Sequence, residues 1–160
     1  MKGLLGALLI FGAAAMYLKK VREDDKCKCY MVQDLLGALE CIMTAIRWEK
    51  QPLPVGIAGQ KDRKYIGKYF ERIDSKLQSK EPLQQIWEDV FSSIQPDEIR
   101  EILTSVTLSG DLTSVLGQLA LATEQIHKFQ EEKKKKQAES WKLRVALTLS
   151  TAGMIVILLL

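Results

Sequence analysis

Three cysteines and one histidine are the residues of this sequence best suited to bind a metal or to act as a nucleophile. They are Cys27, Cys29, Cys41 and His127. Structural zinc sites are built from Cys-x-x-Cys pairs, with a second such pair or with histidines, whereas this chain has Cys-x-Cys. We therefore expect three reduced thiols in a reducing compartment, and no metal site.

The rest of the sequence has none of the usual signs of catalysis. It contains no Gly-x-x-x-x-Gly-Lys phosphate-binding loop, no Gly-x-Ser-x-Gly nucleophile turn and, with a single histidine, no histidine cluster. We interpret Gly56-Ile57-Ala58-Gly59 as a flexible loop. Trp48 and Trp87 are interpreted as packing residues and Trp141 as a membrane-interface residue. We predict that the protein is not an enzyme and has no catalytic, cofactor-binding or metal-binding residues.

Charge divides the chain into three parts. Residues 3–18 and 145–160 carry no charged side chain, while all 20 Asp and Glu and all but one of the 23 Lys and Arg lie between them. Each terminal run is somewhat shorter than the roughly 20 residues that usually span a bilayer. We predict transmembrane helices at 3–18 and 145–160, flanking a domain at 19–144 with its core at about 30–130. The domain is nearly neutral, so we expect no nucleic-acid partner.

The basic residues beside the two apolar runs predict their orientation. Lys19 and Lys20 follow the first run, and Lys142 and Arg144 precede the second. Lys and Arg beside a span mark its cytoplasmic side, so we expect a cytoplasmic middle domain and both chain ends outside. The alternative is a signal peptide cleaved after Ala15, which would leave a secreted protein anchored by its tail.

Apolar residues at steps of three and four predict helices throughout the middle domain. One helix runs from Tyr30 to the pair Pro52-Leu53-Pro54, three shorter ones follow, and Ser109-Gly110-Asp111 is a turn before a last, long helix. We leave open whether residues 19–28 are helical or a charged hinge, and expect Glu131–Lys136 to be a solvated surface that could also hold anionic headgroups. The predicted fold is all-α: a helical bundle whose two long antiparallel helices continue into the N- and C-terminal transmembrane helices.

The order and spacing of these features resemble a known family. The features are Leu4–Ile10 close to Met1, Asp34–Arg47 followed by the proline pair, Ser109-Gly110-Asp111 opening a long polar helix, and the apolar run Ile155–Leu160. Together they resemble the stage III sporulation protein AB family of endospore-forming bacteria, over nearly the full length.

The resemblance implies a function in spore formation. It implies a structural or adaptor component of the channel complex between mother cell and forespore, placed in the mother-cell membrane around the forespore. The middle domain is similar to the cytoplasmic F domain of the type II secretion platform, which couples a cytoplasmic ATPase to a membrane assembly. The implied partners are the lipid bilayer and the other proteins of the stage III sporulation A operon, the AA ATPase first among them. Self-association stays open.

Another function class fits the same pattern. The protein could instead be a membrane-tethered regulatory helical domain that binds a soluble cytoplasmic factor. Such a domain would have the same membrane anchors and would require no catalytic residues. The adaptor reading predicts an ATPase that co-purifies, whereas the regulatory reading predicts a soluble partner that is not an ATPase.

Overall fold

The computed structural model describes the backbone of residues 2–79 and 81–159. The side chains of residues 2–11, 156, 158 and 159 lie outside the described part, and with them most of the side chains of the first predicted span. The fold class is confirmed: the described residues form six α-helices and no strand. These are α1 (Lys2–Arg47), α2 (Leu53–Ala58), α3 (Gly67–Leu77), α4 (Leu83–Phe91), α5 (Asp97–Thr104) and α6 (Leu112–Leu159).

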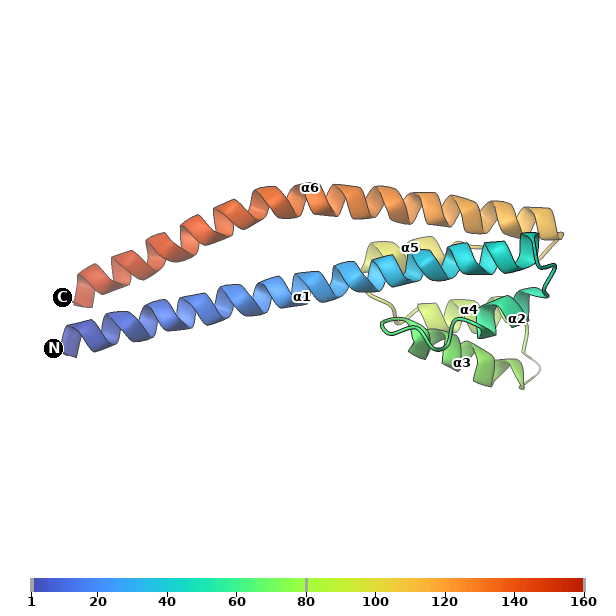
Figure 1. Cartoon of the computed structure of the whole chain (residues 1–160), viewed down its shortest axis with the longest axis horizontal. Helices are drawn as coiled ribbons and strands as arrows, with labels where there is room; N and C mark the ends of the chain where they lie inside the picture. The colour runs from blue at the N-terminus through green and yellow to red at the C-terminus, as the bar shows by residue number, and fades with distance from the viewer. Residues whose placement is uncertain (1, 80, 160) are drawn as a thin grey trace. The chain divides into compact units, whose positions relative to one another are not determined.

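The chain divides into two compact units. The terminal unit contains residues 1–27 and 131–160, and the central unit contains residues 28–130. Both long helices contribute to each unit, α1 with its first and second parts and α6 in the reverse order (Figure 1). Residues 19–28, left open between helix and hinge, are helical because α1 runs through them without a break.

A single apolar core holds the central unit together. Its largest side chains come from α1 (Leu35, Leu39, Ile42), from α3 (Phe70, Ile73) and from α4 (Ile86, Trp87, Phe91), and all of them are fully buried. The Trp87 ring lies 4.5 Å from that of Phe91, and its indole N–H donates to the carbonyl oxygen of Leu103, 2.8 Å away. Burial of such side chains contributes about 1.5–3 kcal/mol each, so packing, more than helix propensity, holds the short helices in place.

The apolar residues from Leu112 to Phe129 recur at alternating steps of three and four, which predicts a heptad-like seam along the last helix, and the structure confirms it over most of its length. Val115, Leu119, Ala122 and Ile126 are buried in the core at successive steps of four, three and four residues. Leu112, the first residue of the predicted seam, is instead 54% exposed, because it is the first residue of α6 and lies at the edge of the core.

Prolines begin three of the short helices. Pro52, Pro82 and Pro96 stand directly before α2, α4 and α5, where a proline costs no hydrogen bond and its fixed φ suits a helix start. The prediction of three short helices is wrong, because there are four. The segment Gly56–Gly59, predicted to be a flexible loop, contains the last turn of α2.

The glycine in α2 explains that error. Gly56 and Ile57 are buried, and a Cβ on Gly56 would lie 3.7 Å from the Cβ of Ala45 and 3.8 Å from the carbonyl oxygen of Ile42. Both distances are ordinary van der Waals contacts, so Gly56 lies packed against α1, and a sequence pattern cannot separate such a buried glycine from a flexible loop.

The segment between α5 and α6 is extended, and its backbone hydrogen-bonds to a side chain of α4. Gln84 of α4 donates to the carbonyl oxygen of Val106 (3.1 Å) and accepts from the backbone N–H of Leu108 (2.7 Å). One amide thus satisfies both a donor and an acceptor of this segment, which then turns at Gly110, with φ of 118°, into α6.

Candidate functional site

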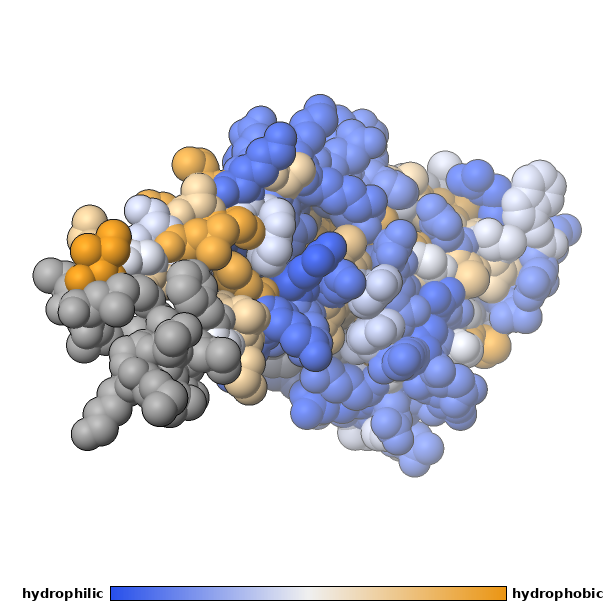
Figure 2. Space-filling model, turned by 60° about the vertical axis from the view of Figure 1, so that its left-hand side comes forward, coloured by the Kyte–Doolittle hydropathy of each residue, from blue (hydrophilic) through white to orange (hydrophobic). Residues whose placement is uncertain are grey.

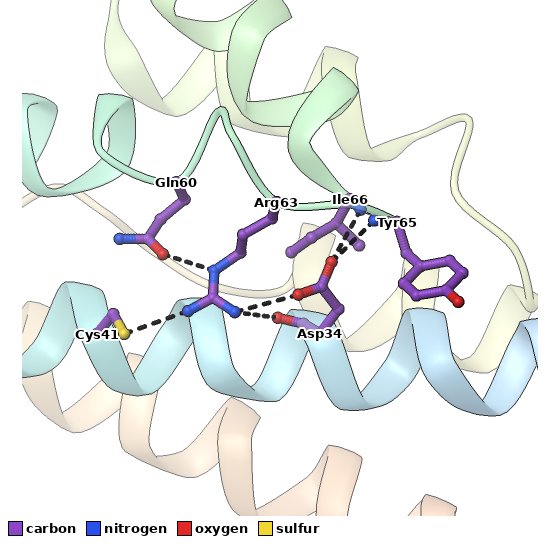
Figure 3. A network of polar contacts seen from close by, with 6 residues as sticks. All are labelled: Asp34, Cys41, Gln60, Arg63, Tyr65 and Ile66. Atoms are coloured by element: carbon purple, nitrogen blue, oxygen red, sulfur yellow. Dashed lines mark hydrogen bonds and ion pairs between the residues drawn. The ribbon is translucent and has the colours of Figure 1, made fainter.

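A network of polar contacts joins α1 to the connection between α2 and α3 in the central unit (Figure 3). The Arg63 guanidinium donates from Nη1 to the Asp34 carboxylate (3.1 Å) and to the Asp34 carbonyl oxygen (3.3 Å). The other carboxylate oxygen accepts the backbone N–H groups of Tyr65 (2.9 Å) and Ile66 (3.3 Å). Asp34 therefore fixes both a side chain and the backbone that leads into α3.

Two further groups accept hydrogen bonds from Arg63. Its Nε donates to the side-chain oxygen of Gln60 (2.7 Å), and its Nη2 donates to the sulfur of Cys41 (3.2 Å). Next to the network, the Tyr30 and Tyr65 rings are stacked at 5.8 Å. The contacts tie α1 to the whole α2–α3 connection, which has no secondary structure of its own.

Two glycines make the room that this arrangement needs. A Cβ on Gly37, one turn from Asp34, would lie 3.0 Å from Nη1 of Arg63. A Cβ on Gly67, the first residue of α3, would lie 2.2 Å from the carbonyl oxygen of Lys61. The first glycine admits the guanidinium, and the second lets the connection fold tightly against the start of α3.

The chemistry of the network is suited to holding α1 and the α2–α3 connection together. Asp34 and Arg63 neutralise one another, and their side chains are only 17% and 24% exposed. The Asp34 carboxylate accepts three hydrogen bonds, and the network offers no nucleophile paired with a base. We conclude that it positions the α2–α3 connection, which presents its outer face to solvent.

The residues considered for metal chemistry are three free thiols and an exposed imidazole. Cys27 and Cys41 are exposed, Cys29 is partly buried, and all three are free thiols. His127 is exposed, with its Nε2 3.8 Å from the carboxylate of Glu40. Within the described part of the chain, no three His, Cys, Asp or Glu side chains are grouped so that they could hold a metal ion.

The tryptophans differ from their sequence-based interpretation in one case. Trp87 is fully buried, as a packing residue should be, but Trp48 is 76% exposed. The interpretation of Trp48 as a packing residue is wrong because α1 ends at Arg47, one residue before it, so Trp48 is no longer on the buried face of the helix. Val55 of α2 is also exposed. Exposed aromatic side chains are typical of binding surfaces.

In the terminal unit, two polar contacts join α1 to α6. The Arg22 guanidinium lies over the Trp141 ring at 5.6 Å, and Arg144 lies 3.5 Å from the carboxylate of Asp25. Both contacts lie in the charged segments next to the apolar runs, outside the predicted spans 3–18 and 145–160. Ala152 is buried, so the pairing of the two helices continues into the second apolar run, where a small residue allows close approach.

Beyond these contacts the surface of the terminal unit is apolar. Large hydrophobic side chains are exposed there on both helices: Met16, Tyr17, Leu143, Leu147, Leu149, Met154, Ile155 and Ile157. Figure 2 shows this hydrophobic surface next to the grey atoms, and a strongly hydrophilic surface beyond it. Soluble proteins rarely expose contiguous apolar surface of this kind.

Among the described residues, one helix segment is long and apolar enough to cross a membrane. It is Gly12–Arg47, the part of α1 whose side chains are described. Leu35, Leu39 and Ile42 in this segment are fully buried in the core of the central unit, and the core helix of a soluble domain passes the same test of length and composition. The finding fits membrane association.

Comparison with known protein families identifies one family. The model of the stage III sporulation protein AB family matches residues 3–160. No curated protein and no solved structure matches the chain.

Proposed function

The chain belongs to the stage III sporulation protein AB family, and from this premise we propose that it is a membrane-anchored adaptor of the channel complex between mother cell and forespore. In this proposal residues 3–18 and 145–160 span the mother-cell membrane around the forespore. Residues 19–144 form a cytoplasmic domain, and the complex that contains it is needed for endospore formation.

One observation carries the anchoring part of the proposal. The terminal unit exposes large apolar side chains on both α1 and α6, and basic residues stand beside them, after the apolar run on α1 and before it on α6. In water this surface would promote aggregation, whereas in a bilayer it faces lipid. The basic residues beside it then mark the cytoplasmic side, and Trp141 lies at the level of the headgroups.

The adaptor part of the proposal rests on the form of the central unit. Its helices are clamped together by the Asp34–Arg63 network, while Trp48 and Val55 remain exposed. A rigid helical domain with exposed apolar side chains suits the binding of another protein. We propose that it couples a cytoplasmic ATPase, the AA protein of the same operon, to the membrane assembly, as the F domain of a type II secretion platform would.

Thiol labelling of the native cysteines tests the topology. Cys27 and Cys41 are exposed and should react with a membrane-impermeant maleimide only after the membrane is opened. As a matched control, a variant with K2C and all three native cysteines changed to Ser should be labelled in intact cells that produce the protein without forming spores, where the outer face of the membrane is open to the reagent. Labelling of the native cysteines from outside would overturn the proposed topology.

Co-purification tests the partner. The full chain, extracted in mild detergent, should retain the AA ATPase, and W48A should retain less of it. Recovery of a soluble protein other than an ATPase would favour a different function, a membrane-tethered regulatory domain that binds a cytoplasmic factor.

A further inference from the structure

We propose that the terminal unit carries a basic collar that binds the headgroups of anionic phospholipids on the cytoplasmic side. We use the name collar for two groups of lysines, Lys19 and Lys20 on α1 and Lys134, Lys135 and Lys136 on α6, which lie on either side of the Arg22–Trp141 contact along the helix pair. The inference rests on the proposed membrane anchoring and goes beyond it, because spanning a bilayer requires an apolar surface and sets no preference among headgroups.

Charge is separated between the two units. The terminal unit has eleven Lys and Arg against six Asp and Glu, a net charge of +5, whereas the central unit has twelve against fourteen, a net charge of −2. The positive charge of the protein is therefore concentrated where the chain adjoins its apolar runs. An anionic surface would attract this part of the molecule and not the central unit.

The collar lysines are not neutralised within the protein. All five are exposed, and none of them forms an ion pair or hydrogen bond with a residue that the structure describes. Glu131 and Glu132 stand four residues before Lys135 and Lys136, at the spacing of helical ion pairs, yet they are not paired with them. Further along the same helix, Glu124 and Lys128 have this spacing and do pair, at 2.7 Å.

The α6 lysines lie within reach of a membrane surface. They are five to seven residues from Trp141, which corresponds to about 8–11 Å along the helix axis. The screening length at physiological ionic strength is about 8 Å. Three successive residues also cover about 200° of the helix circumference, so the lysines are spread over more than half of it.

Lipid selectivity of the full chain in bilayers tests the collar. The protein is reconstituted in phosphatidylcholine with a trace of spin-labelled phosphatidylglycerol or spin-labelled phosphatidylcholine, and electron spin resonance measures the fraction of each label that the protein immobilises. We expect a preference for phosphatidylglycerol of about threefold or more at about 0.01 M salt, falling towards none at about 1 M.

Two variants that lose the same charge distinguish the effect of the collar lysines on lipid preference from the effect of the net charge of the protein. K134Q/K135Q/K136Q should remove most of the preference, whereas K50Q/K61Q/K64Q, which changes three exposed lysines of the central unit, should keep it. Circular dichroism confirms that each variant is folded, and the salt dependence of the unaltered chain tests the proposal without any variant. Equal loss in both variants would overturn the collar.

The remaining outcomes distinguish this inference from the proposed function. If both labels are immobilised equally in the unaltered chain, the protein is anchored and the collar is overturned. If neither label is immobilised, the chain does not span the bilayer, so the anchoring fails and the collar fails with it.

Discussion

The guanidinium of Arg63 lies 3.1 Å from the carboxylate of Asp34, although 29 residues separate them along the chain. Asp34 is on the long helix α1, and Arg63 is in the connection between two short helices. The same carboxylate also accepts the backbone N–H groups of Tyr65 and Ile66. The short helices are therefore held against α1 by a directed polar contact as well as by apolar packing.

Removal of the Asp34 carboxylate should destabilise the central unit. We expect D34A to lower the free energy of unfolding by about 1–3 kcal/mol, because it leaves a half-buried guanidinium and two backbone N–H groups without their acceptor. Denaturant titration of the full chain in detergent, followed by circular dichroism, measures the loss. D89A, which removes the exposed partner of Lys76, should cost much less, and equal losses would contradict a special role for Asp34.

Gly37 should be coupled to Arg63. Replacing a helical glycine with alanine usually stabilises by about 1 kcal/mol, but here the new Cβ would lie 3.0 Å from the guanidinium. We therefore expect G37A to stabilise an R63A variant by about 1 kcal/mol and to be neutral or destabilising in the unaltered chain. A double-mutant cycle measures the difference, and the same effect in both backgrounds would refute the coupling.

Two other glycines should respond to alanine in opposite directions. In α6, Gly117 has no atom within 4 Å of an added Cβ, so G117A should stabilise by about 0.5–1 kcal/mol. In α3, a Cβ on Gly67 would lie 2.2 Å from a backbone oxygen, so G67A should destabilise by about 1–3 kcal/mol or more. Thermal unfolding of the two variants side by side checks the order, and a stable G67A would show that the connection can shift.

A buried amide on α6 should be replaceable with a gain in stability. Gln130 is 8% exposed, and its side-chain nitrogen has no hydrogen-bond partner among the described residues. We expect Q130L to stabilise by about 1–2 kcal/mol, because the variant no longer buries an unsatisfied donor. Q125L, at an exposed position on the same helix, is the matched control and should change little. Destabilisation by Q130L would indicate that the amide does have a partner.

The exposed ion pair between Glu124 and Lys128 on α6 should stabilise the protein over a defined pH range. The hydrogen bond from Lys128 lowers the pKa of Glu124, and the same bond raises the pKa of Lys128. The contribution of Glu124 is thus complete above its ordinary value of 4.5 and is lost as the pH falls through the lowered value. The stability difference between the unaltered chain and E124Q should therefore be constant near neutral pH and shrink in acid. A difference that grows in acid would contradict the assignment.

Much of the fold could be predicted from periodicity and from prolines. Steps of three and four residues between apolar side chains predict α1, α3 and α6 because one helical face must be buried, and Pro82 and Pro96 mark the starts of two short helices. The same rules fail at α2, where Gly56 is buried inside a helix although its sequence context is typical of a loop. They also fail at Trp48, because the end of α1 at Arg47 decides its exposure.

The candidate site could not be predicted in the same way. Asp34 and Arg63 are ordinary surface residue types, and their partnership depends on how the α2–α3 connection folds back onto α1. No local spacing carries that information. Gly37 and Gly67 were available as signals, since a glycine inside or at the start of a helix often marks a close approach, but they do not identify what approaches.

Trp48, Trp87 and Trp141 lie in three different surroundings. One is open to water, one is sealed in the core with its N–H bonded to Leu103, and one lies under the Arg22 guanidinium in the terminal unit. Because indole emission shifts with the polarity around the ring, the unmodified protein contains three intrinsic optical probes. Trp-to-Phe variants that keep one tryptophan at a time should separate a quencher-sensitive red emission at Trp48 from a shielded blue emission at Trp87. The emission of Trp141 would then report directly on entry of the helix pair into lipid.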